Sequence, residues 1–276
     1  MDSVVVDGVR IGFDRVGTGA AVLLAGGTGM PPIAWQACGL RDALTDAGYE
    51  VISYAARGVA PSDAPPPPYT IEQMAGDAAG LLDALDVRDA ALVGYSLGSF
   101  TVELLARTRP DLARCAVLVA GAGPVTPLLS AVLAMEAELI TTVGHIPDTA
   151  AAFQTLMTGL APTPLRDDEG LVSQWVQMLG YQRQMWTSKD GENGQSTAAC
   201  SWLHDEHRMA ALRNITIPVL VASFEHDVLF PPRTGRIAAE ALPHGEFTVV
   251  RGAAHAGVMT HPGETIEAVI GFLSRT

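Results

Sequence analysis

Short apolar runs bounded by glycine, proline and polar residues recur along the chain, and segments of helical spacing separate them. Such runs are typical of strands buried on both faces of a parallel sheet. The first segment, residues 3–16, is expected to form two short strands around Asp7-Gly8, a hairpin-type turn. Further strands are predicted at residues 20–25, 50–54, 90–95, 115–120, 217–222 and 247–250.

Amphipathic helices are predicted between these runs, because apolar residues there recur three and four positions apart. They cover residues 35–47, 71–85, 97–107, 234–242 and 264–274. Alternating strands and helices build right-handed βαβ crossovers. The fold class is therefore α/β, with a mostly parallel eight-stranded sheet flanked by helices.

The alternation stops after Gly123 and resumes after Leu212. Residues 124–212 contain no convincing buried strand and are predicted to form helices instead. Two domains follow from this: an α/β core made of residues 1–123 and 213–276, and a helical domain of residues 124–212. The helices are expected near residues 128–142, 149–160, 169–186 and 197–212, with the polar stretch SKDGENGQS as a loop between the last two.

Composition narrows the classes of function. The chain has 276 residues, 48% of them hydrophobic and 17% charged, which excludes a largely disordered protein. Its net charge of −13 disfavours nucleic acid and anionic membrane surfaces as partners. Three widely spaced cysteines form no CxxC pair, and the first residues do not form a signal peptide. We therefore expect a cytoplasmic protein with reduced thiols and no membrane span.

The sharpest motif is the sequence Gly94-Tyr95-Ser96-Leu97-Gly98, which lies between a predicted strand and a predicted helix. A turn this tight holds its serine in a strained backbone conformation and needs small neighbours. The side chain then projects above the carboxyl edge of the sheet, beside the N-terminus of the helix. Ser96 is therefore the candidate nucleophile.

A serine hydroxyl needs a base to remove its proton and an acid to orient that base. Asp227 and His255 follow later strands in the required order, acid before histidine. Glu225 remains an alternative acid, and the neighbouring His226 is expected to be a loop side chain. A second histidine pair, His204 and His207, lacks a third ligand at matching spacing, so we expect no metal site and no cofactor.

Acyl transfer also needs hydrogen-bond donors for the oxyanion that forms on the substrate. One donor is expected to be the backbone N–H of Leu97. The other should come from the glycine-rich loop that includes Gly26, Gly27 and Thr28. This loop lacks the Lys-Ser/Thr ending of a phosphate-binding loop and is no dinucleotide fingerprint.

Together these motifs resemble the α/β-hydrolase superfamily, in the branch of small esterases, perhydrolases, C–C bond hydrolases and epoxide hydrolases. The resemblance covers essentially the whole chain and is carried by GGTGM, SYAARGVAPSD, GYSLG, EHD and GAAH. It implies that Ser96, Asp227 and His255 are nucleophile, acid and base, and that Thr28 supplies the second oxyanion N–H. It also implies that residues 124–212 form a lid after strand six. Many members have His-Gly where this chain has Gly26-Gly27, and the epoxide hydrolases have aspartate where it has Ser96.

The helical segment is rich in large apolar side chains, most of which are expected to pack against the core. Tyr95, Trp175, Met178 and Trp186 are the candidate substrate contacts. We therefore expect hydrolysis of an ester or lactone with a mainly hydrophobic acyl group. C–C bond hydrolysis, perhydrolysis, thioester release and a lyase or cyclisation step remain alternatives, as does a non-enzymatic small-molecule receptor. The sequence leaves the oligomeric state open.

Overall fold

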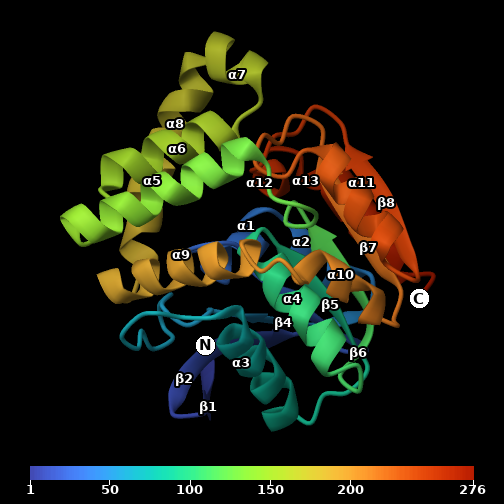
Figure 1. Cartoon of the computed structure of the whole chain (residues 1–276). Helices are drawn as coiled ribbons and strands as arrows, with labels where there is room; N and C mark the ends of the chain where they lie inside the picture. The colour runs from blue at the N-terminus through green and yellow to red at the C-terminus, as the bar shows by residue number, and fades with distance from the viewer.

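The computed structural model describes residues 1–276, apart from the side chain of Gln182, and is organised around one eight-stranded sheet (Figure 1). The strand order is β1-β2-β4-β3-β5-β6-β7-β8. β2 pairs antiparallel with β1 and β4, and all other pairs are parallel, which confirms the predicted mostly parallel eight-stranded sheet. The strands are β1 (Asp2–Val6), β2 (Val9–Val16), β3 (Ala20–Ala25), β4 (Tyr49–Tyr54), β5 (Ala90–Tyr95), β6 (Ala113–Val119), β7 (Val219–Phe224) and β8 (Gly245–Val250).

Helices cover both faces of the sheet because successive strand residues point to opposite sides. In β3, Leu23 packs into the core beneath one helical layer, and Val22 and Leu24 pack into the core beneath the other. The first layer holds α3 (Ile71–Ala84), α4 (Leu97–Thr108) and α11 (Pro232–Ala241), with α10 (Arg208–Ala211) beside α11. The second layer holds α1 (Ile33–Ala37), α2 (Leu40–Asp46), α12 (Gly257–Thr260) and α13 (Pro262–Leu273).

The helix predicted at residues 35–47 is in fact two short helices, α1 and α2. Gly39 separates them with a backbone φ of 78°, a left-handed conformation that ends one helix and starts the next. Among the described residues, none of the helices combines the length and apolar character needed to cross a bilayer.

Besides α10, five α-helices lie between β6 and β7, within residues 124–212, which we call the helical insertion. Figure 1 shows α5, α6, α7 and α8 as a group standing off the end of the sheet, while α9 runs between this group and the core. Short 3₁₀ turns follow α8 and α10, at Arg183–Met185 and Leu212–Asn214. The helices are α5 (Pro127–Val143), α6 (Asp148–Gly159), α7 (Pro162–Asp167), α8 (Glu169–Gln182) and α9 (Lys189–Leu203).

The stretch SKDGENGQS was wrongly expected to be a loop. From Lys189 onward it forms the first half of α9, and the side of that helix holding Gly191, Gly194 and Gln195 is buried against the core. The backbone of Gly191 meets that of Gly58, and Gly194 lies on the ring of Tyr69. The glycines therefore serve close packing between helix and core, which outweighs their low helix propensity.

Candidate active site

Ser96 occupies the tight turn between β5 and α4, in the strained conformation that the motif predicts. Its backbone angles are φ 51° and ψ −119°, and its N–H donates to the carbonyl oxygen of Val119 at 2.9 Å. A Cβ atom at Gly94 would overlap the carbonyl oxygen of Gly98, and one at Gly98 would overlap that of Ala25. Only glycine fits at either position, so the sequence of this turn fixes where the serine side chain projects.

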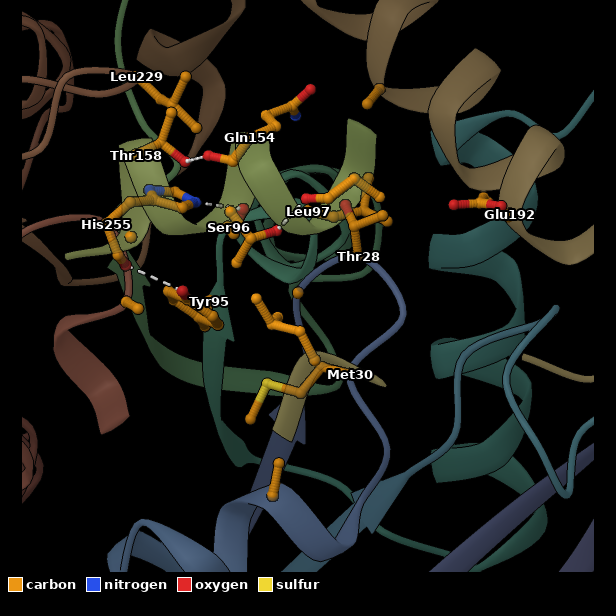
Figure 2. Close-up of a pocket in the computed structure, with 18 of the residues that line it drawn as sticks. Thr28, Met30, Tyr95, Ser96, Leu97, Gln154, Thr158, Glu192, Leu229 and His255 are labelled. Atoms are coloured by element: carbon orange, nitrogen blue, oxygen red, sulfur yellow. Dashed lines mark hydrogen bonds between the residues drawn. The ribbon is translucent and has the colours of Figure 1, made fainter. Parts of the chain in front are cut away.

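His255 lies on the loop after β8, where contacts from three directions fix its position. Its backbone N–H donates to the carbonyl oxygen of Thr158 in α6 at 3.2 Å, and its own carbonyl accepts from the Tyr95 hydroxyl at 2.9 Å (Figure 2). The ring of Phe230 stacks against the imidazole with centroids 5.8 Å apart. Residues from both the helical insertion and the core thus fix the loop that carries His255.

Ser96, His255 and Asp227 form one continuous hydrogen-bonded chain. The Ser96 Oγ lies 3.0 Å from His255 Nε2, and His255 Nδ1 lies 2.8 Å from Asp227 Oδ2. The buried Asp227 carboxylate is fixed at its other oxygen, which accepts from the N–H groups of Leu229 at 2.8 Å and Phe230 at 3.0 Å. This is the geometry in which a histidine can take a serine proton while an acid orients its ring.

Glu225, the alternative acid, takes no part in the hydrogen bonds that join Ser96, His255 and Asp227. It accepts hydrogen bonds from the backbone N–H of Gly252 at 2.9 Å and from the Arg251 guanidinium at 2.8 Å, and these bonds lower the pKa of Glu225. The histidine pair is also elsewhere: the Nδ1 of His204 lies 2.8 Å from the carbonyl oxygen of Cys200. Within the part of the chain that the structure describes, no group of three acidic, histidine or cysteine side chains is placed to hold a metal ion.

Thr28 and Leu97 flank Ser96 on the side away from His255 (Figure 2). Both line the cavity, and neither backbone N–H donates to another group among the described residues. Two unoccupied N–H groups beside a serine are what a tetrahedral oxyanion needs. Gly27 lines the same cavity, and Gly26 precedes it, directly after the last residue of β3.

Gln195 in α9 holds this glycine-rich loop, and sequence reasoning missed it. Its Oε1 accepts from the N–H of Gly29 at 2.9 Å, and its Nε2 donates to the carbonyl oxygen of Arg57 at 2.9 Å. Arg57 in turn forms a buried bidentate ion pair with Asp77. The small residues at 191, 194 and 198, at helical spacing, are the signal that could have revealed the buried face of α9.

A cavity of about 490 Å³ opens above Ser96 between the core and the helical insertion. Its wall is mainly apolar, and all four candidate substrate contacts, Tyr95, Trp175, Met178 and Trp186, lie on it. The apolar side chains of the insertion divide between two environments. Leu129, Leu133, Leu179 and Met185 line the cavity, whereas Leu128, Met135, Phe153 and Met157 are exposed on the outside.

A strand-turn-helix serine, a histidine and an acid on later strand ends, and a sheet with two antiparallel edge pairings define the α/β-hydrolase class. The family model for the alpha/beta hydrolase fold matches residues 21–262. The chain therefore belongs to the α/β-hydrolase fold family and is an enzyme of that family.

Relatives across this family carry different activities in their names. The chain is 30% identical over 266 residues to the Mycobacterium tuberculosis protein named as a non-heme bromoperoxidase, BpoC, covering 96% of this chain and 98% of that one. A crystal structure of BpoC superposes with a TM-score of 0.87, covering 99% of this chain and 97% of that chain. An Azorhizobium caulinodans protein named as the carbamate hydrolase RutD is 25% identical, covering 94% of this chain and 93% of that one. The 3-oxoadipate enol-lactonase 2 of Acinetobacter baylyi is 25% identical, covering 80% and 79%.

Proposed function

We propose that the protein is a serine hydrolase that cleaves a carboxylic ester or lactone through an acyl-enzyme on Ser96. The observation that carries this proposal is the hydrogen-bonded chain from Ser96 through His255 to Asp227, at the floor of a mainly apolar cavity. The relative named as an enol-lactonase is similar in sequence and agrees with this reaction class. We further propose that the helical insertion is a lid and that Tyr95, Trp175, Met178 and Trp186 contact the substrate.

The proposed acylation begins when His255 Nε2 accepts the proton of the Ser96 hydroxyl. The Ser96 Oγ then attacks the carbonyl carbon, and the N–H groups of Thr28 and Leu97 stabilise the negative oxygen of the tetrahedral intermediate. Asp227 keeps the imidazole oriented and stabilises its charged form. The intermediate collapses as His255 donates its proton to the leaving alkoxide, which departs as an alcohol.

Deacylation repeats these roles with water. His255 accepts a proton from a water molecule, whose oxygen attacks the acyl carbon on Ser96. The same two N–H groups hold the second oxyanion. When the bond to the Ser96 Oγ breaks, that oxygen recovers a proton from His255, and the carboxylic acid is released.

Turnover of p-nitrophenyl butyrate by the wild type and Ser96→Ala tests this proposal. Loss of the nucleophile is expected to lower kcat by about a factor of a million, as in serine hydrolases in which the triad acts as a unit. Ser173→Ala, an exposed serine on α8, is the matched control and should retain wild-type kcat. Equal turnover by Ser96→Ala and wild type would refute the mechanism.

Perhydrolysis is a second candidate, and the similarity to BpoC is the observation that favours it. Hydrogen peroxide in place of water would attack the acyl group on Ser96, giving a peroxycarboxylic acid and the free serine. The peroxycarboxylic acid would oxidise bromide, which with one proton taken up from solution becomes hypobromous acid, and the carboxylic acid would be regenerated. Bromination of monochlorodimedone in acetate, peroxide and bromide, lost in Ser96→Ala, would support this activity; equal bromination by both proteins would exclude it.

A further inference from the structure

One part of the cavity wall carries polar and charged side chains where the rest is mainly apolar. Glu136 comes from α5, Gln154 from α6 and Ser196 from α9, and we call these three residues the polar wall. Glu192 lies nearby on α9. Figure 2 shows Glu192 on the side of the cavity opposite to His255, with Ser96 between them. The acyl-transfer mechanism uses none of these side chains.

The polar wall has more hydrogen-bond acceptor positions than donors within the protein to pair with them. Gln154 Nε2 donates to Glu136 Oε1 at 2.7 Å, and Ser196 Oγ donates to Glu136 Oε2 at 2.8 Å. A carboxylate can accept about four hydrogen bonds, so Glu136 retains acceptor capacity. The buried Oε1 of Gln154 accepts no hydrogen bond from any described residue. An entering donor can therefore use the remaining acceptor capacity of Glu136, which lines the cavity.

Positive charge is scarce around this wall. Arg183 is the one arginine or lysine among the described residues that line the cavity, and two other carboxylates occupy it. Its guanidinium binds Glu192 through two hydrogen bonds and Asp148 at 3.0 Å. Glu136 has no cationic partner in the described structure. Burial raises its pKa, an effect that the hydrogen bonds from Gln154 and Ser196 reduce and the nearby Glu192 charge adds to.

We propose that the polar wall binds a hydrogen-bond-donating group, a hydroxyl or an ammonium, at the end of the substrate remote from the scissile carbonyl. This inference rests on the proposed function, because it specifies the substrate that Ser96 attacks. The apolar lining would contact the hydrocarbon part of the substrate between the carbonyl and its far end. The polar wall would then select the chemical group at that far end. A carboxylate end group would meet Glu136 without a donor or a cation, so the site selects against it.

Binding to Ser96→Ala tests the wall independently of turnover, and the cavity residues Trp175 and Trp186 supply a fluorescence signal. The ligands are the methyl esters of ω-hydroxyhexanoic and ω-aminohexanoic acids, methyl heptanoate and monomethyl pimelate, with chains varied from butanoyl to octanoyl. At the best length, a donor-ended ester is expected to bind about tenfold more tightly than its methyl-ended counterpart. The carboxylate-ended ester should bind most weakly. The corresponding diol monoacetates and alkyl acetates test the reverse orientation.

Equal binding of the hydroxyl, ammonium and methyl end groups at every length, in both series, would overturn the polar wall. Retained preference in Ser96→Ala together with no ester turnover by the wild type would instead reject only the proposed hydrolysis. The two proposals therefore fail separately.

Glu136→Gln tests whether the wall is the source of this preference. The variant keeps the shape of the side chain but replaces one acceptor oxygen with an amide donor, so the ratio of donor-ended to methyl-ended affinity should fall toward one. Glu138→Gln, at an exposed position on the same helix, should preserve the wild-type ratio. If Glu136 only connects α5 to its neighbours, all ligands weaken together and the ratio stays constant, which would contradict the proposal.

Discussion

At the scale of single residues, position in space separates side chains that the sequence leaves equivalent. Asp227 and Glu225 are two residues apart on the same loop, yet only Asp227 meets His255. The backbone N–H groups of Leu229 and Phe230 fix one Asp227 oxygen and leave the other for the imidazole. Glu225 points instead to Arg251 on the protein surface. The motif around Ser96 could be recognised in the sequence because its chemistry is local, whereas the choice between Asp227 and Glu225 depends on loop geometry.

Asp227→Asn is expected to lower kcat for ester hydrolysis by about four orders of magnitude, because an amide neither orients the required imidazole tautomer nor stabilises its charge. Glu225→Gln is the matched control and should leave kcat within about twofold of wild type, since surface ion pairs contribute little. Steady-state kinetics of both variants measures the difference. Similar losses in the two variants would contradict the assignment of Asp227.

At the scale of secondary-structure elements, the helical insertion completes the site through α9. Gln195 connects this helix to Gly29 in the glycine-rich loop and to the carbonyl oxygen of Arg57. The sequence predicted every strand of the sheet, because the central strands are buried on both faces and leave clear apolar runs, while the Asp7-Gly8 turn indicated the edge hairpin of β1 and β2. It did not predict the first half of α9, whose polar and glycine residues are stabilised by partners far away in the sequence. Local pattern carries no information about such partners.

Gln195→Met should lower kcat by about tenfold with little change in KM, because a loosened Gly29 displaces the neighbouring Thr28 N–H from the oxyanion. Gln195→Glu retains an acceptor for Gly29 and should recover much of the lost kcat. Gln174→Met, at an exposed site on α8, controls for the substitution itself. A rise in KM at unchanged kcat would show that Gln195 shapes the cavity and does not position the glycine-rich loop.

At the scale of the whole molecule, the pKa values of the acidic side chains shift in opposite directions in the interior and on the surface. Burial raises the pKa of Asp77, Glu103 and Glu136, whereas hydrogen bonds to arginine lower the pKa of surface acids such as Asp83 and Asp111. The net charge of −13 gave no hint of these interior acids. The alternating pattern predicted the core, but an interior glutamate on an amphipathic helix looks like any solvated one.

This distribution predicts a pH-dependent stability difference. Folding raises the pKa of Glu136, so the folded protein holds this proton more tightly than the unfolded chain does. The resulting contribution to the free energy of unfolding is fully present below the unfolded pKa of about 4.3 and is lost as pH rises through the folded pKa. Glutamine has no such proton to lose. The Tm of Glu136→Gln minus that of wild type should therefore increase from about pH 5 to about pH 8, measured by scanning calorimetry. Glu138→Gln is the matched control, and a Tm difference for Glu136→Gln that stays constant with pH would contradict the prediction.

The central claim is that Ser96 is an activated nucleophile, and covalent labelling with a fluorophosphonate measures this directly. Mass spectrometry of the labelled wild type should find one adduct, on the peptide that contains Ser96. Ser96→Ala should acquire none, and His255→Ala should react at least about a hundredfold more slowly, because its serine lacks a base. An unlabelled wild type, or an adduct on another residue that persists in Ser96→Ala, would contradict the account.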